Sequence, residues 1–348
     1  MSDALRVLHL MVSDRFAGVE QFVMRLALQQ AHDGHEVWVA GGDPQILAAP
    51  LRAAGIRFAP ISSVRGAVRA TRSADVDVVN SHMTAADVAA VTARLLDSAD
   101  RALVSTRHFA LPRGSRGPRV LYRGVERLLD AEIAISHAVA DNIHVPSTVV
   151  HSGMETPRLT GERRARTVLM AQRLQPEKQT DLGIRAFAES GIAADGWSLH
   201  IAGVGPLRAD LADLALRLGI GEAVRFLGFR DDLPTLLQRS GILLATTPNE
   251  GLGLTVLEAM SAALPVVAAD AGGHRDLLAD VEDARLFHAG DAADAGRQLR
   301  ELASDADERA RLGAAERRVQ ETAFTLRAQA DGTAAVYRQT LRRREAHR

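Results

Sequence analysis

The chain of 348 residues contains no cysteine, and its charge is almost balanced. Without thiols it can form neither disulfides nor thiolate metal sites, which fits a reducing compartment. Its 42 Lys and Arg against 43 Asp and Glu leave no global basic field of the kind that attracts nucleic acid. No window reaches about 18 uncharged apolar residues, the length at which a helix can cross a membrane.

The first residues do not have the pattern expected of a signal peptide. The first residues, MSDALRVLHLMVSD, place an acid before a short apolar run and have neither a basic segment nor a small-residue cleavage site. We interpret this segment as a first β-strand rather than as a signal peptide. These absences together predict a cytoplasmic protein that binds no nucleic acid.

The chain does show a regular alternation of short β-branched runs and longer amphipathic stretches. Hydrophobic residues make up 47% of it, and its length exceeds the roughly 250–300 residues at which a single core stops growing. Strands that alternate with helices indicate βαβ units and a parallel sheet buried on both faces. The apolar runs form two series, at 5–11, 36–42, 76–82, 102–108, 131–137 and 148–153, and again at 167–174, 197–205, 223–229, 241–247 and 265–270.

The sequence therefore predicts an α/β protein with two doubly wound, Rossmann-like domains. We expect one domain at 1–153 and another at 167–322, joined by a polar linker, 154–166, that contains Pro157 and Gly161. Residues 323–348 should form a C-terminal helix that could cross back to the first domain. Ligands of open α/β sheets bind outside the carboxyl ends of the strands, so two sheets facing across a cleft would place functional residues in strand-end loops.

Three such loops carry candidate residues. The segment AQRLQPEKQTD brings Arg173 and Lys178 to the end of the first strand of the second domain, where a guanidinium fork and a point charge would suit a diphosphate. The segment IAGVGPL supplies Gly203 and Gly205, whose small size would let a ligand approach the backbone. In the first domain, Gly18 of SDRFAGVEQF enters a helix whose N–H groups could hold phosphate, although a glycine here could also serve geometry alone.

The segment PNEGLGLTVLEAM, residues 248–260, has a carboxylate on either side of a glycine-rich helix start. The free N–H groups there favour anionic oxygen, but Glu250 and Glu258 would repel a phosphate unless they bind something else. Carboxylates accept hydrogen bonds from hydroxyls, and a nucleotide sugar has hydroxyls on both sides of its diphosphate. We therefore expect Glu250 to hold the transferred sugar and Glu258 the ribose. The backbone between them should hold the phosphates, through Gly251, Leu252, Gly253, Leu254 and Thr255.

These residues together resemble the retaining glycosyltransferases of the GT-B fold in the large family with the E-x7-E motif, family 4 group 1. Glu250 and Glu258 have that spacing, and residues 245–278 look like the most recognisable block of the family. The segments around Arg173 and Lys178 and around Gly203 and Gly205 also match, as does FLGF at 226–229. The first domain matches more loosely, at 32–42, 105–109, 134–140 and 149–155.

The resemblance implies a role for each matching position. Arg173 and Lys178 would stabilise the departing diphosphate in place of a metal, Glu250 would contact the donor sugar, and Glu258 the ribose. His108 stands where many relatives have a histidine that lines the donor sugar. Gly18 lies in the first glycine loop, which departs from the family pattern because Ala17 replaces one of the usual paired glycines.

The resemblance also implies retention of anomeric configuration, by attack on the face of the leaving group. The residues alone leave this open, since an inverting enzyme could use Asp14, His82 or His108 as a base. A UDP-sugar is the favoured donor, with GDP-mannose as the alternative, and no cofactor is implied. The acceptor would be a hydroxyl of a small molecule, a glycan or a lipid-linked compound. Aromatic residues make up only 4%, which gives no sign of a long sugar-stacking groove.

Other functions stay open at this point. A nucleotide-sugar epimerase uses a similar scaffold, a phosphorylase would need a lysine-bound pyridoxal phosphate and a longer chain, and a non-catalytic sugar-nucleotide-binding partner would tolerate loss of Glu250. The D-x-D segments at 75–77 and 305–307 enter a strand and lie in a helical tail, so we expect no metal site. The segment 107–127 could rest on an anionic membrane, which would make the protein peripheral, through six arginines: Arg107, Arg113, Arg116, Arg119, Arg123 and Arg127.

Overall fold

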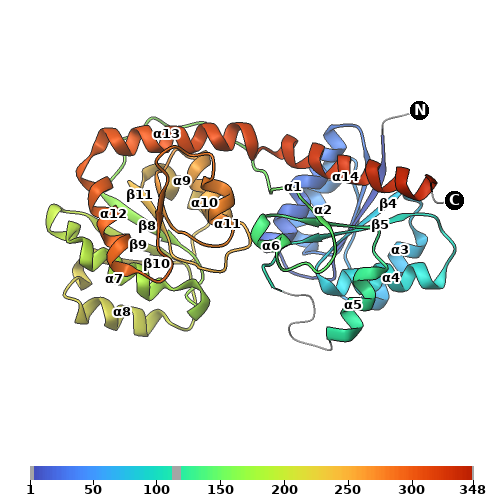
Figure 1. Ribbon diagram of the computed structural model, residues 1–348, viewed down its shortest axis with the longest axis horizontal. Helices are drawn as coiled ribbons and strands as arrows, with labels where there is room; N and C mark the ends of the chain where they lie inside the picture. Colours follow the sequence, from blue (N-terminus) through green and yellow to red (C-terminus); the bar gives the residue numbers. More distant parts are fainter. Residues whose placement is uncertain (1–3, 112–118, 347–348) are drawn as a thin grey trace. The chain divides into compact units, whose positions relative to one another are not determined.

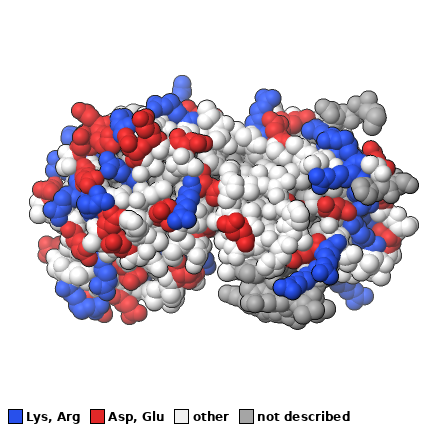
Figure 2. Space-filling view, viewed as in Figure 1, with Lys and Arg blue, Asp and Glu red and all other residues white. Residues whose placement is uncertain are grey.

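The computed structural model describes residues 4–111 and 119–346 and divides the chain into two compact units (Figure 1). The first unit combines residues 1–153 with 326–348, and the second comprises residues 154–325. Within the described residues, no helix is both long enough and apolar enough to cross a bilayer. On the face seen in Figure 2, basic and acidic side chains are interspersed over both units.

The first unit is built on a seven-stranded parallel sheet of order β3-β2-β1-β4-β5-β6-β7. Its central strands are buried on both faces, which explains why the apolar runs are continuous. Three-residue β3 escapes sequence analysis because it is short and none of its residues is fully buried. The strands are β1 (Arg6–Leu10), β2 (Glu36–Ala40), β3 (Arg57–Ala59), β4 (Val78–His82), β5 (Ala102–Arg107), β6 (Ala131–Ala134) and β7 (Ser147–Val149).

Helices of the first unit begin where local caps favour them. The Asp43 carboxylate accepts from the Gln45 N–H, and Pro44 occupies the first helical position of α2. Ser63 caps α3 in the same way, yet sequence analysis missed this helix because its residues are largely polar. The helices are α1 (Gly18–His32), α2 (Pro44–Ala53), α3 (Val64–Ser73), α4 (Thr84–Leu96), α5 (Arg119–Arg127), α6 (His137–Ala140) and α14 (Leu326–Ala346).

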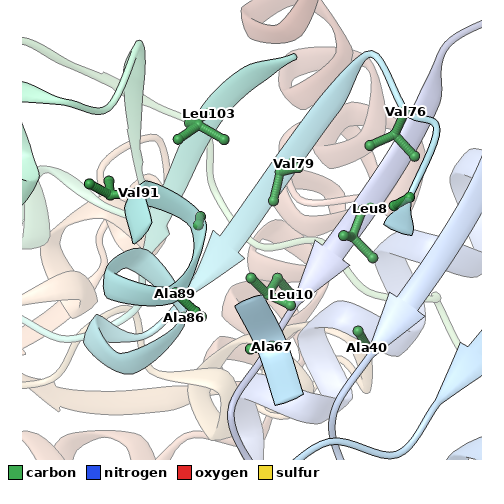
Figure 3. Packing of buried hydrophobic residues seen from close by; sticks show 12 residues of the cluster. Leu8, Leu10, Ala40, Ala67, Val76, Val79, Ala86, Ala89, Val91 and Leu103 are labelled. Carbon is green, nitrogen blue, oxygen red and sulfur yellow. The ribbon is translucent and has the colours of Figure 1, made fainter. Parts of the chain in front are cut away.

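The core of the first unit forms where helices cover the sheet. Figure 3 shows Leu8, Leu10 and Val79 of the sheet in one cluster with Ala86 and Ala89 of α4. The small alanines let α4 approach the strands closely, and burial of such apolar surface contributes about 25 cal/mol per Å².

The C-terminal helix α14 completes a second cluster in the same unit. Val336 and Tyr337 pack against Val78, Val104 and other strand residues, and Tyr337 is fully buried. The Tyr337 hydroxyl accepts a hydrogen bond of 2.6 Å from Asn80 Nδ2 of β4. The last helix of the chain is therefore part of the core of the first unit.

The second unit contains a six-stranded parallel sheet of order β10-β9-β8-β11-β12-β13. Its strands are β8 (Thr167–Ala171), β9 (Ser198–Ala202), β10 (Val224–Gly228), β11 (Ile242–Ala245), β12 (Val266–Ala269) and β13 (Arg285–Phe287). Its helices are α7 (Thr180–Ser190), α8 (Arg208–Arg217), α9 (Leu233–Arg239), α10 (Leu254–Ser261), α11 (Gly273–Leu278), α12 (Ala292–Ser304) and α13 (Ala306–Ala323). Short 3₁₀ turns are η1 (Pro176–Lys178), η2 (Ile192–Asp195) and η3 (Gly221–Ala223).

Residues 154–166, expected as a linker, pack with the second unit. Arg164 donates to the carbonyls of Leu237 at the end of α9 and Ala262 at the end of α10, at 2.8 and 2.5 Å. A guanidinium can satisfy the orphan carbonyls of two helix ends at once. Arg164, a polar residue of the expected linker, therefore caps two helices of the second unit.

Candidate functional site

The loop after β8 carries the two predicted cations. It passes through η1 and turns at Gln179, which has a left-handed φ of 49° and separates η1 from α7. Gln172 Nε2 holds the loop closed by donating to the Lys178 carbonyl at 3.0 Å and to Thr180 Oγ1 at 2.9 Å. Lys178 is therefore the last residue of η1 and lies before the first turn of α7.

Gly203 and Gly205 fit closely against this loop. A Cβ at Gly203 would lie 1.9 Å from the Gln172 carbonyl oxygen, and a Cβ at Gly205 would lie 2.2 Å from the Leu174 carbonyl oxygen. Gly203 also has a φ of 142°, which side chains rarely adopt. Both glycines are thus needed for the packing of two strand-end loops, whether or not a ligand approaches them.

Lys178 and Glu250 meet at the carboxyl end of the sheet. Lys178 Nζ lies 2.6 Å from Glu250 Oε2, and both side chains are largely buried, with 16% and 26% exposed. Arg173, in contrast, is 65% exposed, and its guanidinium lies 3.5 Å from the Glu177 carboxylate. The structure therefore brings together the residues that the sequence predicts from two strand-end loops and leaves Arg173 accessible beside them in the chain.

Helix α10 begins directly after this pair. Gly253 is its N-cap with a left-handed φ of 98°, so the N-cap residue has no side chain with which to cap the helix. Among the described residues, no backbone acceptor faces the N–H groups of Leu254 and Thr255, while Thr255 Oγ1 donates to the Ala171 carbonyl at 3.3 Å. These first N–H groups carry the partial positive charge of a helix start. Leu252 is 2% exposed, so only its backbone can contact a ligand.

His274 belongs to this site although sequence analysis did not select it. A Cβ at Gly253 would lie 2.9 Å from His274 Cδ2, so the ring lies directly against the helix start. Its Nδ1 lies 3.2 Å from the Ala269 carbonyl and carries the proton, which leaves Nε2 as an acceptor. Burial lowers the pKa of His274. The nearby Glu250 carboxylate raises this pKa and Lys178 lowers it further, but burial is the largest effect, so the ring is neutral at pH 7. The signal was its position, just after buried strand β12.

The remaining predicted residues of this segment are partly accessible. Glu258 lies within α10 with a half-buried side chain, and its backbone carbonyl accepts from Ser261 Oγ at 2.7 Å. Gly251 is also half-buried. Both lie in the same segment as Glu250, as the E-x7-E spacing requires.

The predicted residues of the first unit lie at the carboxyl ends of its strands. His108 follows β5 and is buried with 9% exposed, and its ring packs edge-on against Phe22 at 4.7 Å. Gly18 opens α1, where Glu20 Oε2 accepts from the Ala17 N–H at 2.9 Å. His82 is fully buried, so it has no access to an incoming acceptor, while Asp14 is exposed.

The arginine-rich segment 107–127 does not present all its charges to solvent. Arg107 is buried, with its guanidinium 3.8 Å from the carboxylates of Glu126 and Glu132. Arg123 and Arg127 are exposed. Arg113 and Arg116 lie outside the described residues, and Arg119 starts α5.

The two D-x-D segments have structural partners. Asp75 and Asp77 both pair with Arg6, at 2.5 and 2.7 Å. Asp305 caps α13 by accepting from the Glu308 N–H at 2.9 Å. Both segments thus stabilise local structure.

Known proteins resemble this chain in sequence and in fold. A family model described as glycosyl transferases group 1 matches residues 158–319, and one described as glycosyltransferase family 4 matches residues 16–158. The chain is 38% identical over 104 residues to the putative glycosyltransferase EpsD of Bacillus subtilis, covering 30% of this chain and 27% of that one. It is 29% identical over 238 residues to the lipopolysaccharide core mannosyltransferase LpsB of Rhizobium meliloti, covering 62% and 67%.

Among solved structures, Anabaena HepE in complex with UDP and glucose has a TM-score of 0.81 at 20% identity, covering 96% of this chain and 100% of that one. This likeness confirms the predicted GT-B fold. The matches span about half or less of the length of the first curated relatives. Together the two family models span residues 16–319, which include most of both units. The chain belongs to the group 1 glycosyltransferases of family 4.

Proposed function

We propose that the protein transfers a hexose from a nucleotide-diphosphate sugar to a hydroxyl acceptor, with retention and without a metal or other cofactor. The observation that carries this proposal is the Lys178–Glu250 pair at 2.6 Å, beside the uncapped start of α10. Lys178 and the start of α10 can bind a phosphate group, and the Glu250 carboxylate beside them can bind hydroxyls.

Charge explains how such a site would act. When the sugar–phosphate bond breaks, the sugar becomes oxocarbenium-like and negative charge grows on the diphosphate. Lys178, Arg173 and the N–H groups of Leu254 and Thr255 are donors for that charge. Preorganised donors of this kind are worth roughly 10²–10³ in rate apiece. They would replace the metal ion that neutralises a diphosphate in other enzymes.

The ion pair also explains how the Glu250 carboxylate can lie so close to a site for phosphate. Glu250 already has a cationic partner, so its charge is offset while the site is empty. A donor would bring its diphosphate to Lys178 and its sugar hydroxyls to Glu250, and each partner of the pair would exchange one contact for another. Glu258 would hold the ribose.

The donor is proposed to be a UDP-sugar. HepE, a neighbour in fold, is described in complex with UDP and glucose. The curated relative LpsB is a mannosyltransferase, which keeps GDP-mannose as the alternative. The acceptor is a hydroxyl of a small molecule, a glycan or a lipid-linked compound, and exposed Arg123 and Arg127 could bring the protein to an anionic membrane.

Nucleotide binding tests the site first. Thermal shifts would be measured with UDP, GDP and ADP, with and without EDTA, on the wild type, Arg173→Ala and Lys178→Ala. Arg239→Ala is a matched control, because Arg239 is 61% exposed and pairs with Glu162 much as Arg173 is 65% exposed and pairs with Glu177. We expect a shift with UDP that EDTA does not change, that the control keeps and that the two site variants lose.

Other outcomes would contradict separate parts of the proposal. A shift with GDP alone would replace UDP by the alternative donor, and a shift abolished by EDTA would overturn metal independence. No shift with any nucleotide would exclude the donor site as described. Retention is tested by NMR on the hydrolysis of the donor, since the first anomer released should match that of the donor.

A further inference from the structure

Three histidines form a hydrogen-bonded line through the first unit. His9 of β1, His82 of β4 and His108 after β5 come from neighbouring strands of the sheet. His9 Nδ1 lies 3.1 Å from His82 Nε2, and His82 Nδ1 lies 3.0 Å from His108 Nε2. At the far end, Gln30 Oε1 of α1 lies 2.7 Å from His9 Nε2. The line therefore connects Gln30 to the predicted site residue His108.

All three rings are neutral at pH 7. His9 and His82 are fully buried, and only His108 reaches the surface, with 9% exposed. Burial lowers the pKa of His9 to about 4 and that of His108 to about 3, with a further decrease at His108 from Arg107. Burial also places the pKa of His82 well below its usual value. Each ring then has one N–H and one lone pair.

Neutral rings in a line must all donate in the same direction, because each ring-to-ring contact holds one proton. The Gln30 carbonyl oxygen can only accept, so His9 carries its proton on Nε2. Its Nδ1 then accepts from His82 Nε2, and His82 Nδ1 accepts from His108 Nε2. The one ring nitrogen outside the line, Nδ1 of His108, is left with a lone pair.

We propose that Gln30, His9 and His82 are positioning residues that fix the tautomer of His108, so that His108 Nδ1 offers a hydrogen-bond acceptor to a ligand hydroxyl. The inference rests on the proposed function only for the identity of that ligand, a sugar hydroxyl of the donor. An acceptor at this atom selects a ligand that donates, and it excludes phosphate or carboxylate oxygens as partners of the ring. It also excludes His108 as a general acid.

NMR of the full-length protein labelled with ¹⁵N-histidine tests the proposal without reference to activity. Protonated and unprotonated ring nitrogens have well separated ¹⁵N shifts, and single His→Asn variants assign the three rings. We expect all three to carry the proton on Nε2. In Gln30→Leu the acceptor is lost, and His108 should change to a mixture of tautomers. In Gln30→Glu an ionised carboxylate still accepts at this position, so His9 should keep its proton on Nε2.

Two controls keep the test sharp. Thr71→Val removes another buried polar side chain of the first unit, whose hydroxyl bonds the Ala67 carbonyl, and should leave the His108 shifts unchanged. Tryptophan fluorescence from Trp38, measured in a Trp197→Phe background, shows whether the first unit of each variant is folded. A proton on Nδ1 of His108 in the wild type, or His108 shifts that do not respond to Gln30→Leu, would overturn the proposal.

Kinetic measurements test which ligand His108 binds, separately from its tautomer. If the protein transfers sugar, Gln30→Leu should raise the donor KM by about three- to ten-fold, as for the loss of one neutral hydrogen bond, with a smaller change in kcat. His108→Ala should raise it as much, and the double variant no further. An unchanged KM with altered His108 shifts would overturn the ligand assignment alone, whereas absence of any transfer would contradict the proposed function and leave the tautomer result standing.

Discussion

Buried ionisable residues of this protein are stabilised in two different ways. In the second unit, Lys178 and Glu250 form an ion pair, with Lys178 Nζ 2.6 Å from Glu250 Oε2. In the first unit, the rings of His9, His82 and His108 are neutral. His108 donates a hydrogen bond to His82, and His82 donates one to His9. Paired ions can exchange partners when a ligand arrives, whereas neutral rings hold a fixed pattern of donors and acceptors.

The ion pair predicts that loss of the Glu250 carboxylate affects sugar transfer far more than UDP binding. In Glu250→Gln, Lys178 loses its anionic partner but remains available to a diphosphate, so UDP should bind within about threefold of wild type or more tightly. Transfer should fall by roughly 10²-fold or more, because the sugar loses its carboxylate. Calorimetric titration with UDP and a transfer assay check the two halves. Weaker UDP binding in this variant would mean that Glu250 acts mainly by orienting Lys178.

The histidine line predicts that the first unit is sensitive to acid. The pKa values of its three rings are lowered by folding, so the unfolded state binds more protons once the pH falls below about 6.5. The stability that these rings contribute is present above that pH and is lost progressively towards pH 4. Trp38 and Trp197 are the two tryptophans of the chain, one in each unit, so Trp197→Phe leaves Trp38 as the reporter of the first unit.

Urea unfolding of that variant should show a midpoint that falls steadily between pH 6.5 and 4, the range given by the unfolded histidine and by the pKa of His9. A midpoint that does not change with pH across this window would contradict neutral, buried rings.

At the scale of elements, packing between loops decides the site as much as the loops themselves. Gly203 has no room for a Cβ against the Gln172 carbonyl, whereas Gly219, also with a positive φ of 73°, has no atom within 4 Å of such a Cβ. Both substitutions to alanine strain the backbone, but only Gly203→Ala must also move the loop that carries Arg173 and Lys178. The geometry of the cation site therefore depends on a neighbouring strand end.

This comparison gives a matched pair of variants. Gly219→Ala should lower the free energy of unfolding by about 1 kcal/mol, from the left-handed backbone alone. Gly203→Ala should cost about 3 kcal/mol more, because overpacking is added, and should lose the thermal shift by UDP. Trp197 fluorescence in a Trp38→Phe background measures the second unit. Equal costs for the two variants would show that the loop after β8 yields easily.

Helix α13 carries a buried acid beneath β12. Glu316 is fully buried, and its Oε1 accepts from the Val266 N–H at 3.2 Å. Burial raises the pKa of Glu316 well above its usual value, so the folded state keeps a proton that the unfolded state releases above about pH 4.5. The stability contributed by the acid is thus complete below that pH and declines as the pH rises.

Glu316→Gln keeps the hydrogen bond and removes the proton uptake. We expect it to stabilise the second unit at pH 7 and to have little effect at pH 4, measured through Trp197 as above. Glu321→Gln, on the same helix but 43% exposed, is the control and should change the free energy by less than about 0.5 kcal/mol at either pH. A destabilised Glu316→Gln at pH 7 would show that the carboxylate is charged and bound.

Sequence analysis predicted most of the strands and the position of the second-unit candidates in strand-end loops, because such loops follow from alternation along the chain. Lys178 and Glu250 were found in this way. The line of histidines was not, since His9 and His82 are 73 residues apart and lie in strands buried on both faces, where no side-chain period marks a contact. Strands β3 and β13 were missed, because each has only three residues and most of these are not fully buried.

At the scale of the whole molecule, the second unit is inserted between two parts of the first. Its ends lie together, since the Met154 N–H donates to the Phe324 carbonyl at 3.0 Å and Met154 also pairs with Thr325. The first unit, in contrast, needs α14, whose Val336 and Tyr337 belong to its core. The two units therefore differ in what they need to fold.

Truncation tests this difference. Residues 154–325 expressed alone should fold and bind UDP, because their ends meet within the unit. A chain that stops at residue 325 should lose the cooperative unfolding of the first unit, seen at Trp38, while the second unit stays intact, seen at Trp197. Cooperative unfolding at Trp38 in the truncated chain would show that α14 only covers a core that is already complete.

The position of α14 has a consequence for synthesis on the ribosome. The chain emerges from its N-terminus, so the strands of the first sheet appear first, yet the helix that covers Val78 and Val104 appears last. The nascent first unit must wait, with part of its apolar surface open, while the whole second unit is made. Its final collapse can begin only when α14, whose codons follow those of the whole second unit, has been translated.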